Sequence, residues 1–448
     1  MTSRTFLFLQ SPPGRFVAKL AREIRSRGHH VLRINLCLGD RLQWSGPGAT
    51  SFRGSYDGWR DFLADYIRRH GVTDILYYGD RLPYHRVAME VADDLGVTTT
   101  VYEFGYLRPD WITLERRGMS SLSHFPNDRV KIHAAAEGLP APDMTVTFPH
   151  GFATEAFHEV VHHLSTYFGR PFYPRYNADA FYNPLLNYLS YIPRLMASGR
   201  RGRRAFVRTA KWIESGRRYM LVPLQMQNDY QLRANSPFRH QSEAIDLVLR
   251  SLAASPDREL GVVFKIHPLD NGWERWSHVV GAKANALGLG DRFTTIDGGH
   301  LPTLLDHAEG VILINSTVGI SSILKGRPTK VLGMATFDIP GLTHQGPLDT
   351  FWTTPEAPDP AVRDAFLRLL ANSIQIKGSF YNRAGMAKAA TEIADRLITG
   401  TVNEPGAFVD PPPRLEKARQ MGVPFLDQAM PSAVACSSAA RLKAKARP

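Results

Sequence analysis

Short apolar runs alternate with amphipathic stretches along the first 105 residues of the chain. Residues 5–10 (TFLFLQ) form an apolar run that favours a buried strand, and Phe16, Leu20 and Ile24 then recur at helical spacing. The full pattern predicts strands at 5–10, 29–40, 73–80 and 98–105, and helices at 16–28, 59–71 and 83–96. Strands that alternate with helices across short turns are typical of a parallel sheet covered on both faces.

The same rhythm resumes at residue 218. It predicts strands at 218–229, 261–270, 291–297, 311–316 and 328–333, and helices at 242–255, 278–288, 301–310 and 317–326. Helical patterns then continue through 366–378 and 381–400. We therefore expect a second doubly wound sheet, and a chain of 448 residues is also long enough for two domains.

The segment between these halves is rich in aromatic residues and helix formers and shows no clear strand. It is expected to be a helical insertion that bridges two domains. The proline run at Pro411 to Pro413 marks the expected edge of order near the C-terminus. The predicted fold class is α/β, with two Rossmann-like domains facing a cleft: an N-terminal domain at 1–150, a helical bridge at 151–218, a C-terminal domain at 219–400 and a flexible basic tail at 401–448.

The chain is basic, with 54 Lys and Arg against 42 Asp and Glu, a net charge of +12. Such a charge attracts phosphate, whether in a nucleotide, a nucleic acid or an anionic lipid. The segment from Arg194 to Arg218 holds one acid, Glu214, among these basic residues: Arg194, Arg200, Arg201, Arg203, Arg204, Arg208, Lys211, Arg217 and Arg218. We interpret this cluster as a contact with an anionic membrane surface, and the alternative is a solvated helix face.

Other classes of protein are disfavoured. No apolar run reaches the ~18 residues of a transmembrane helix, and the FLFL run near the N-terminus is too short for a signal-peptide core. The two cysteines, Cys37 and Cys436, lie almost the whole chain apart, which argues against a disulfide framework or a structural zinc site. We expect a protein of the reducing cytoplasm.

Candidate chemistry gathers at the expected carboxyl ends of strands, where ligands bind in such sheets. His267 and Pro268 follow one buried strand, and Asn315, Ser316 and Thr317 follow another and open a helix. An imidazole, hydroxyl groups and free backbone N–H groups bind phosphate well. If the two strand ends are neighbours, as we expect, they converge on one phosphate. The alternatives are a loop histidine and simple N-capping.

Two carboxylates also lie at strand ends. Glu103 ends the last strand of the first half and is a candidate general acid/base, while Gly105 beside it allows close backbone approach. Gln225, Gln227 and Asp229 follow the first strand of the second half. Asp229 is a candidate nucleophile or acceptor-orienting group, and the two glutamines are candidate substrate ligands. A helix or turn cap is the alternative for this stretch.

Further polar residues of the first half are candidate substrate ligands: Tyr106, Arg108, Asp80, Arg81 and His85. Structural salt bridges and strand-end turns are the alternatives. The chain has neither a G-x-G-x-x-G nor a Walker loop, and no Asp-x-Asp motif in a plausible metal-binding loop. We therefore expect no metal and no cofactor.

Over roughly residues 5–390 the chain resembles the bacterial capsule β-Kdo transferases of the KpsS/LipB type, which use the acidic sugar Kdo. The motifs that carry the resemblance are EFGYLRPD from Glu103, QMQND ending at Asp229, His267-Pro268, Asn315-Ser316-Thr317, and the openings LQSPPGRF and YYGDRLPYHRVA. The resemblance implies a GT-B-like fold and CMP-β-Kdo as the donor. It also implies transfer with retention to lysophosphatidylglycerol, or to Kdo already on that lipid.

The resemblance also implies roles for residues and partners. The nucleotide is expected at His267, Pro268, Asn315, Ser316 and Thr317, with Asp229 as nucleophile and Glu103 as acid/base. The implied partners are a CMP-sugar, an anionic lipid acceptor and other capsule assembly proteins, for a protein peripheral to the inner membrane. A different donor (CMP-sialic acid or a UDP-sugar) and a non-enzymatic capsule export adaptor are the alternatives. Nucleic acid is disfavoured because the arginine cluster lacks an aromatic stacking platform.

Overall fold

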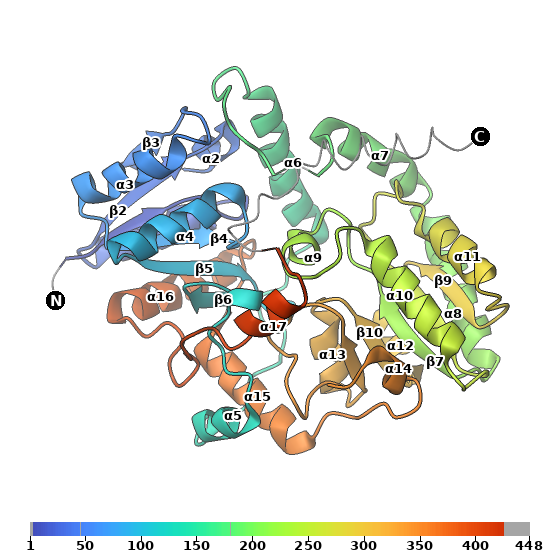
Figure 1. The fold of residues 1–448 in the computed structure, drawn as a ribbon. Helices are drawn as coiled ribbons and strands as arrows, with labels where there is room; N and C mark the ends of the chain where they lie inside the picture. The colour runs from blue at the N-terminus through green and yellow to red at the C-terminus, as the bar shows by residue number, and fades with distance from the viewer. Residues whose placement is uncertain (1–2, 45, 180, 425–448) are drawn as a thin grey trace.

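The computed structural model describes residues 3–44, 46–179 and 181–424. The first sheet contains β1 (Thr5–Phe8), β2 (His30–Asn35), β3 (Ala49–Ser51), β4 (Asp74–Tyr78), β5 (Thr98–Phe104), β6 (Trp111–Arg116) and β12 (Gln375–Lys377). The second contains β7 (Tyr219–Pro223), β8 (Gly261–Ile266), β9 (Phe293–Asp297), β10 (Gly310–Leu313) and β11 (Thr329–Val331). Figure 1 shows β2, β3 and β4 of the first sheet in blue and β7, β9 and β10 of the second in green to orange on the other side of the molecule. The predicted pair of α/β domains is confirmed.

Helices cover both sheets. Those of the first domain are α1 (Phe16–Ser26), α2 (Leu38–Gln43), α3 (Trp59–His70), α4 (Pro83–Leu95), α5 (Arg129–Ala136), α15 (Pro360–Ser373) and α16 (Arg383–Thr399). Those of the second are α9 (Tyr230–Ala234), α10 (Gln241–Ala254), α11 (Trp276–Ala286), α12 (Leu301–His307), α13 (Val318–Leu324) and α14 (Leu348–Phe351). No helix in the described ranges is long and apolar enough to cross a membrane.

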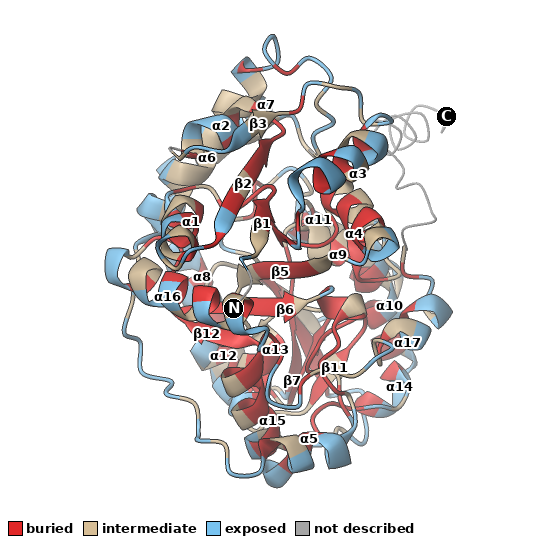
Figure 2. Cartoon of the chain, turned by 90° about the vertical axis from the view of Figure 1, so that its left-hand side faces the viewer, coloured by how far each residue is buried: buried red, intermediate tan, exposed pale blue. Residues whose placement is uncertain are grey.

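The central strands are apolar on both faces because helices cover both. Every residue of β8, GVVFKI, is buried. Val262 and Phe264 pack with Trp276 of α11, whereas Val263 faces the core on the other side of the sheet. Figure 2 shows the strands largely in the colour of buried residues and the outer faces of the helices as exposed. This explains why continuous apolar runs marked the strands in the sequence.

The strand order fixes where a ligand can bind. The second sheet is parallel throughout, in the order β11-β10-β7-β8-β9, so its direction of winding reverses between β7 and β10. Such a reversal opens a crevice at the carboxyl ends of the two strands. The order also corrects one expectation: β8, which precedes His267, and β10, which precedes Asn315, are not neighbours, because β7 lies between them. The end of β7 therefore takes part in any site that joins them.

The first sheet has a part that the sequence pattern did not predict. Its order is β12-β6-β5-β4-β1-β2-β3, and β6 and β12 run antiparallel to their neighbours. The predicted helix at 366–378 is wrong at its end, because residues 375–377 form β12 and Ile376 pairs with Ile112. This pairing buries Ile376 in the core beneath α1 and α16. Residues 360–399, from α15 through α16, thus belong to the first domain, which corrects the predicted C-terminal domain of 219–400.

Residues 151–218 form α6 (Phe152–Phe168), α7 (Pro184–Met196) and α8 (Ser198–Glu214), with no strand among the residues described there. Helix α6 packs against α2 of the first domain, and α8 packs against β9 of the second. The segment therefore runs from one domain to the other, as Figure 1 shows for α6 and α7.

Five of the nine basic residues of the cluster bind the second domain. Arg194 and Arg201 pair with Asp297 at the end of β9. Others bind in the same domain: Arg208 to the Thr295 carbonyl, Arg217 to Asp291, and Arg218 to Asp257 and Glu309. These arginines attach the end of α7, α8 and the turn before β7 to the second domain, which corrects the interpretation of the whole cluster as a membrane contact. Exposed basic residues remain on α8: Arg200, Arg203, Arg204 and Lys211.

The chain after residue 400 is packed as far as the structure describes it. Helix α17 (Leu415–Gln420) follows Arg414, which is 2% exposed. The Arg414 guanidinium donates to the carbonyls of Phe125, Pro126, Ala335 and Thr336. The prediction of a flexible tail from 401 is therefore wrong for 401–424, and its remainder, 425–448, lies outside the described residues.

We expect Arg414→Ala to destabilise the protein. Removal of the guanidinium leaves buried carbonyls without donors, and lost hydrogen bonds to a buried charged group should lower the free energy of unfolding by about 3 kcal/mol. Urea unfolding of the purified protein measures the change. Gln420→Ala, an exposed change on α17, is the matched control and should leave the midpoint unchanged. Equal stability of the Arg414→Ala protein would contradict the structural role of this residue.

Candidate active site

A cavity of about 190 Å³ lies between the two domains. Nine of the residues singled out from the sequence line it: Glu103, Tyr106, Arg108, Gln225, Asp229, His267, Asn315, Ser316 and Thr317. The first three come from the end of β5 and the turn after it, and the others come from the ends of β7, β8 and β10. The expected cleft between the domains is thus present, at the crevice that the strand order defines.

Glu103 is held in the cavity by two donors from α9. The Tyr230 hydroxyl donates to Glu103 Oε2 at 2.5 Å, and Gln231 Nε2 donates to the same oxygen at 3.0 Å. Burial raises the pKa of Glu103 to about 7, and the nearby charge of Asp229 adds to this rise. Gly79 makes room for Tyr230, because a Cβ at this position, which has a φ of +68°, would lie 2.8 Å from the Tyr230 hydroxyl oxygen. The result is a carboxyl group that exchanges its proton near neutral pH.

Asp229 is both a helix cap and a cavity residue. Its Oδ1 accepts from the Gln231 backbone N–H at 2.9 Å at the start of α9, and its Oδ2 accepts from Gln225 Nε2 at 3.3 Å. The capping interpretation is therefore confirmed, and the same contacts fix the carboxylate at the cavity wall. Burial raises the pKa of Asp229. Two carboxylates from different domains thus share one cavity: both oxygens of Asp229 accept hydrogen bonds, and Glu103 accepts two on Oε2.

His267 presents one defined nitrogen. Its Nδ1 accepts from the Leu269 backbone N–H at 3.1 Å, so the proton of the neutral ring is on Nε2. Burial lowers the pKa of His267 to about 4, which keeps the ring neutral at physiological pH. The side chain is then a fixed N–H donor at the edge of the cavity.

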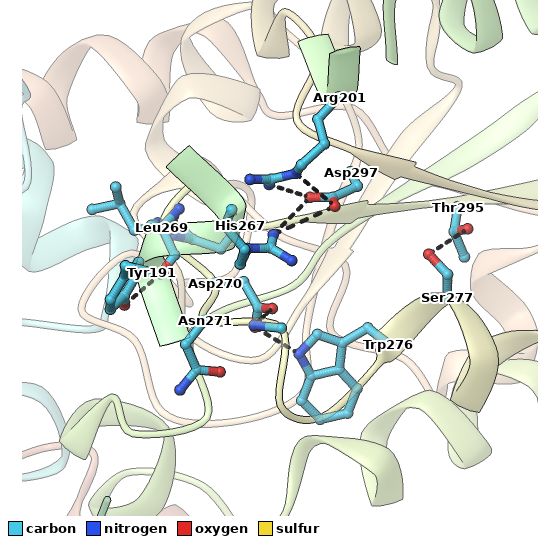
Figure 3. A network of polar contacts seen from close by, with 12 residues as sticks. Tyr191, Arg201, His267, Leu269, Asp270, Asn271, Trp276, Ser277, Thr295 and Asp297 are labelled. Carbon is cyan, nitrogen blue, oxygen red and sulfur yellow. Dashed lines mark hydrogen bonds and ion pairs between the residues drawn. The ribbon is translucent and has the colours of Figure 1, made fainter. Parts of the chain in front are cut away.

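The loop that carries His267 is held by contacts with the helical segment and with α11. Tyr191 of α7 donates to the Leu269 carbonyl at 2.8 Å, and Trp276 Nε1 donates to Asp270 at 3.0 Å. Figure 3 shows these contacts beside Asp297, whose carboxylate receives Arg201. The helical segment therefore supports the position of His267 directly.

Asn315, which follows β10, forms hydrogen bonds with the loop after β7 and with α9. It accepts from Gln225 Nε2 at 2.9 Å and donates to the Gln231 carbonyl at 2.8 Å. Its amide is thus largely engaged within the protein. Ser316 Oγ accepts from the Val318 backbone N–H at 3.3 Å, whereas Thr317, the N-cap residue of α13, makes no side-chain capping hydrogen bond. Ser316 and Thr317 both line the cavity.

Tyr106 and Arg108 complete the side of the first domain. The Tyr106 hydroxyl accepts from Thr336 Oγ1 at 3.0 Å across the domain boundary. Arg108 is exposed, and its guanidinium lies 4.9 Å from the centre of the Phe104 ring. Its positive charge acts on both Asp229 and His267. Arg108 is therefore a cation at the cavity that can meet an anionic group of a ligand.

Five residues singled out from the sequence do not line this cavity: Asp80, Arg81, His85, Gln227 and Pro268. Asp80 is fully buried and accepts from the Met119 N–H at 2.9 Å, and Arg81 donates to Ser121. His85 bonds the Gly79 carbonyl through Nδ1 and stacks on Tyr77.

Gln227 accepts from the Gln241 N–H at 2.9 Å, at the start of α10, and exposed Pro268 forms the turn after β8. Asp80, Arg81, His85 and Gln227 are buried and bonded to other groups of the protein, so the structure gives them a supporting position where the sequence suggested substrate contact.

Other cavity residues were not found from the sequence. Gln231 lines the cavity, and Tyr230 supports it from outside the lining. Both directly follow Asp229, and their hydrogen bonds to Glu103 show only when α9 is placed against β5. The loop after β11 supplies one wall with Met334, Ala335, Thr336 and Phe337, and Phe104, Met119, Ser120 and Met226 complete the lining. This loop follows a strand of the second sheet that the sequence predicted. Its position after a strand is the one signal that could have indicated a place in the cavity wall.

A cluster of possible metal ligands lies elsewhere, where Cys37, Asp40 and His162 have ligand atoms within 4.8 Å of one another. Asp40 Oδ2 accepts from the N–H groups of Leu36 and Cys37, and His162 Nδ1 bonds Gln43. Burial raises the pKa of the Cys37 thiol, which disfavours the thiolate that a metal needs. These contacts explain the cluster as the cap of α2.

Two Rossmann-like domains that meet at a polar cavity define a GT-B-like architecture. The chain matches the family described as "Capsule polysaccharide biosynthesis protein" over residues 73–381, and it belongs to this family. It is 30% identical to "Capsule polysaccharide modification protein LipB" of Neisseria meningitidis serogroup B, over 85% of this chain and 93% of that protein. It is 28% identical to "Capsule polysaccharide export protein KpsS" of Escherichia coli, over 85% of this chain and 98% of that protein.

Among solved structures, the chain is similar to "Thermosulfurimonas dismutans KpsC, beta Kdo 2,7 transferase". The identity is 12%, the alignment covers 89% of this chain and 99% of that chain, and the TM-score is 0.42.

Proposed function

We propose that this protein is a glycosyltransferase of capsule biosynthesis that moves Kdo from CMP-β-Kdo to lysophosphatidylglycerol, or to Kdo already attached to that lipid. The observation that carries the proposal is the meeting of Glu103 and Asp229, from different domains, in one cavity with His267, Ser316 and Thr317. Membership of the capsule polysaccharide biosynthesis family supports it.

The second domain's side of the cavity suits the phosphate of a nucleotide. The Nε2–H of neutral His267 and the hydroxyl groups of Ser316 and Thr317 provide donors there without a requirement for a change in protonation. Such donors stabilise the charge that develops on a departing CMP. Arg108 can pair with the carboxylate of the acidic sugar.

The two carboxylates suit a two-step transfer with retention. In the first step an oxygen of Asp229 bonds to the anomeric carbon, and the bond from that carbon to the CMP phosphate oxygen breaks. In the second step Glu103 takes the proton from an acceptor hydroxyl, whose oxygen bonds to the anomeric carbon and displaces Asp229. Each step inverts the carbon, so the product keeps the configuration of the donor.

A second cavity is placed to receive the acceptor. It measures about 530 Å³ and is lined by Asn228, whose neighbour Asp229 lines the first cavity. Its walls are rich in aromatic side chains: Tyr84, Tyr167, Tyr173, Tyr176, Phe181, Tyr182 and Tyr188. Rings that carry hydroxyl groups suit an amphipathic molecule such as a lysophospholipid.

The donor is tested by incubation of the purified protein with lysophosphatidylglycerol and, in turn, CMP-Kdo, CMP-sialic acid and a UDP-sugar. Release of the nucleotide and formation of a glycosylated lipid are followed together. We expect transfer from CMP-Kdo alone. Transfer from another donor would replace CMP-Kdo in the proposal, and transfer from none of them, with lipid or polysaccharide still bound, would favour an export adaptor.

His267→Ala should weaken use of the donor. Loss of one hydrogen bond to a charged phosphate is expected to lower kcat/KM for CMP-Kdo by roughly 10- to 100-fold. Because the neutral ring acts only as a donor, kcat/KM should depend on pH in the same way in the variant and the parent protein. Steady-state kinetics give both quantities, and His278→Ala, an exposed change on α11, is the control. An unchanged kcat/KM would contradict a phosphate contact for His267.

A further inference from the structure

Helix α7 exposes an apolar face to solvent. Leu186, Leu189 and Ile192 are each about half exposed, at 52%, 51% and 51%, and Met196 is 84% exposed. Their spacing places them on one side of the helix. Single exposed apolar side chains are common on proteins, but a row along one helix marks a surface that meets an apolar partner.

The neighbouring helices also expose apolar side chains. Helix α6 packs against α7 and exposes Phe157, Val161 and Phe168, and α7 packs against α8, which exposes Phe206 and Val207. The exposed basic residues that do not bind the second domain lie on α8: Arg200, Arg203, Arg204 and Lys211. Residues 180–213 contain neither Asp nor Glu. The apolar row of α7 is thus followed by positive charge on α8, and α7 and α8 up to residue 213 contain no acidic residue, whereas α6 carries Glu155 and Glu159.

We propose that the outer faces of α6, α7 and the first half of α8 form a docking surface for an anionic lipid bilayer. Helices with an apolar face and arginines beside it lie in the interface of anionic membranes, where both features contribute to binding. The charge argues for a bilayer as the occupant, because the same arginines beside an apolar row match a sheet of anionic headgroups above acyl chains. The proposal rests on the proposed function for its biological role, since the acceptor is a membrane lipid.

The opposite face of α7 contacts the aromatic cavity and the loop that carries His267. Asn187 and Tyr188 line the aromatic cavity, and Tyr191 and Arg194 bind the Leu269 carbonyl and Asp297 near His267. A protein docked through α7 would therefore hold the acceptor cavity against the lipid surface. An acceptor could then enter the cavity without leaving the bilayer completely.

Flotation of the purified full-length protein with vesicles tests the proposal. Vesicles of phosphatidylglycerol and phosphatidylethanolamine should carry the protein upward, and vesicles of phosphatidylcholine should carry much less. The triple change Leu186→Gln, Leu189→Gln and Ile192→Gln should reduce binding at least tenfold. The triple change Arg200→Gln, Arg203→Gln and Arg204→Gln should reduce it roughly fivefold for each charge removed, and only on anionic vesicles.

A matched control carries Val130→Gln, Leu247→Gln and Leu324→Gln, three exposed apolar positions on other helices. Its binding should equal that of the parent protein. Unchanged flotation of both test variants, or an equal loss in the control, would overturn the proposal, and so would binding that requires a protein partner.

Flotation requires no catalytic turnover, so its result does not depend on which sugar donor the protein uses. Transfer to acceptor dispersed in detergent should persist in both test variants, whereas failure of the proposed function would abolish it in the parent protein too.

Discussion

Asp229→Asn is expected to lower the rate of transfer roughly a thousandfold or more, because an amide cannot form the covalent bond to the sugar. The change leaves the fold intact. Asn is as good an N-cap as Asp, so the contact of residue 229 with the Gln231 N–H at the start of α9 persists. The rate is measured as formation of glycosylated lipid at saturating CMP-Kdo.

The control for this change is Asp359→Asn. Asp359 caps α15 through the N–H groups of Ala361 and Val362, and it lies outside the cavity. This variant should transfer at the parent rate. If Asp229→Asn were equally active, Asp229 would be a cap and an orienting group only, and the nucleophile would have to be sought among the other cavity residues.

Glu103→Gln should lower kcat by roughly 100- to 1,000-fold and change the dependence on pH. The base must be ionised to accept the proton of the acceptor. Because burial raises the pKa of Glu103 to about 7, kcat/KM of the parent protein should rise with pH and level off above about 7. The residual activity of the variant should lack this rise. Initial rates across the pH range measure both effects.

Two further variants show whether Glu103 causes the rise. The Tyr230 hydroxyl lowers the pKa of Glu103 by its hydrogen bond, so Tyr230→Phe should move the rise to higher pH. Glu115 is also fully buried with a pKa raised to about 8, but it lies outside the cavity, so Glu115→Gln should leave the rise in place. A rise that persisted in Glu103→Gln would assign the titration to another group.

Much of the fold followed from the apolar pattern. Parallel strands such as β8 are buried on both faces, so each appears in the sequence as an uninterrupted apolar run. The failures lie where distant pairing decides the structure. Residues 375–377 continue a helical pattern, yet they form β12 because β6 offers an edge to pair with. Arg414 resembles part of a basic tail, and only the four carbonyls around it explain its burial.

The candidate site was predictable to the same extent. Residues at strand ends, such as Glu103 and His267, were found because parallel sheets gather their carboxyl ends at one edge. The sequence could not distinguish residues that line the cavity from residues that follow a strand but are buried inside the domain. Asp80 and His85 also follow a strand, but they bond to the backbone of Met119 and Gly79 inside the domain. The contact of Tyr230 with Glu103 joins two domains, and local patterns do not contain it.

The most direct test of the proposed transfer is mass spectrometry of lysophosphatidylglycerol after incubation with the purified protein and CMP-Kdo. We predict a lipid heavier by a Kdo residue, released CMP in equal amount, and neither product with the Asp229→Asn protein. An unchanged lipid with intact CMP-Kdo, or full product from the Asp229→Asn protein, would contradict the account.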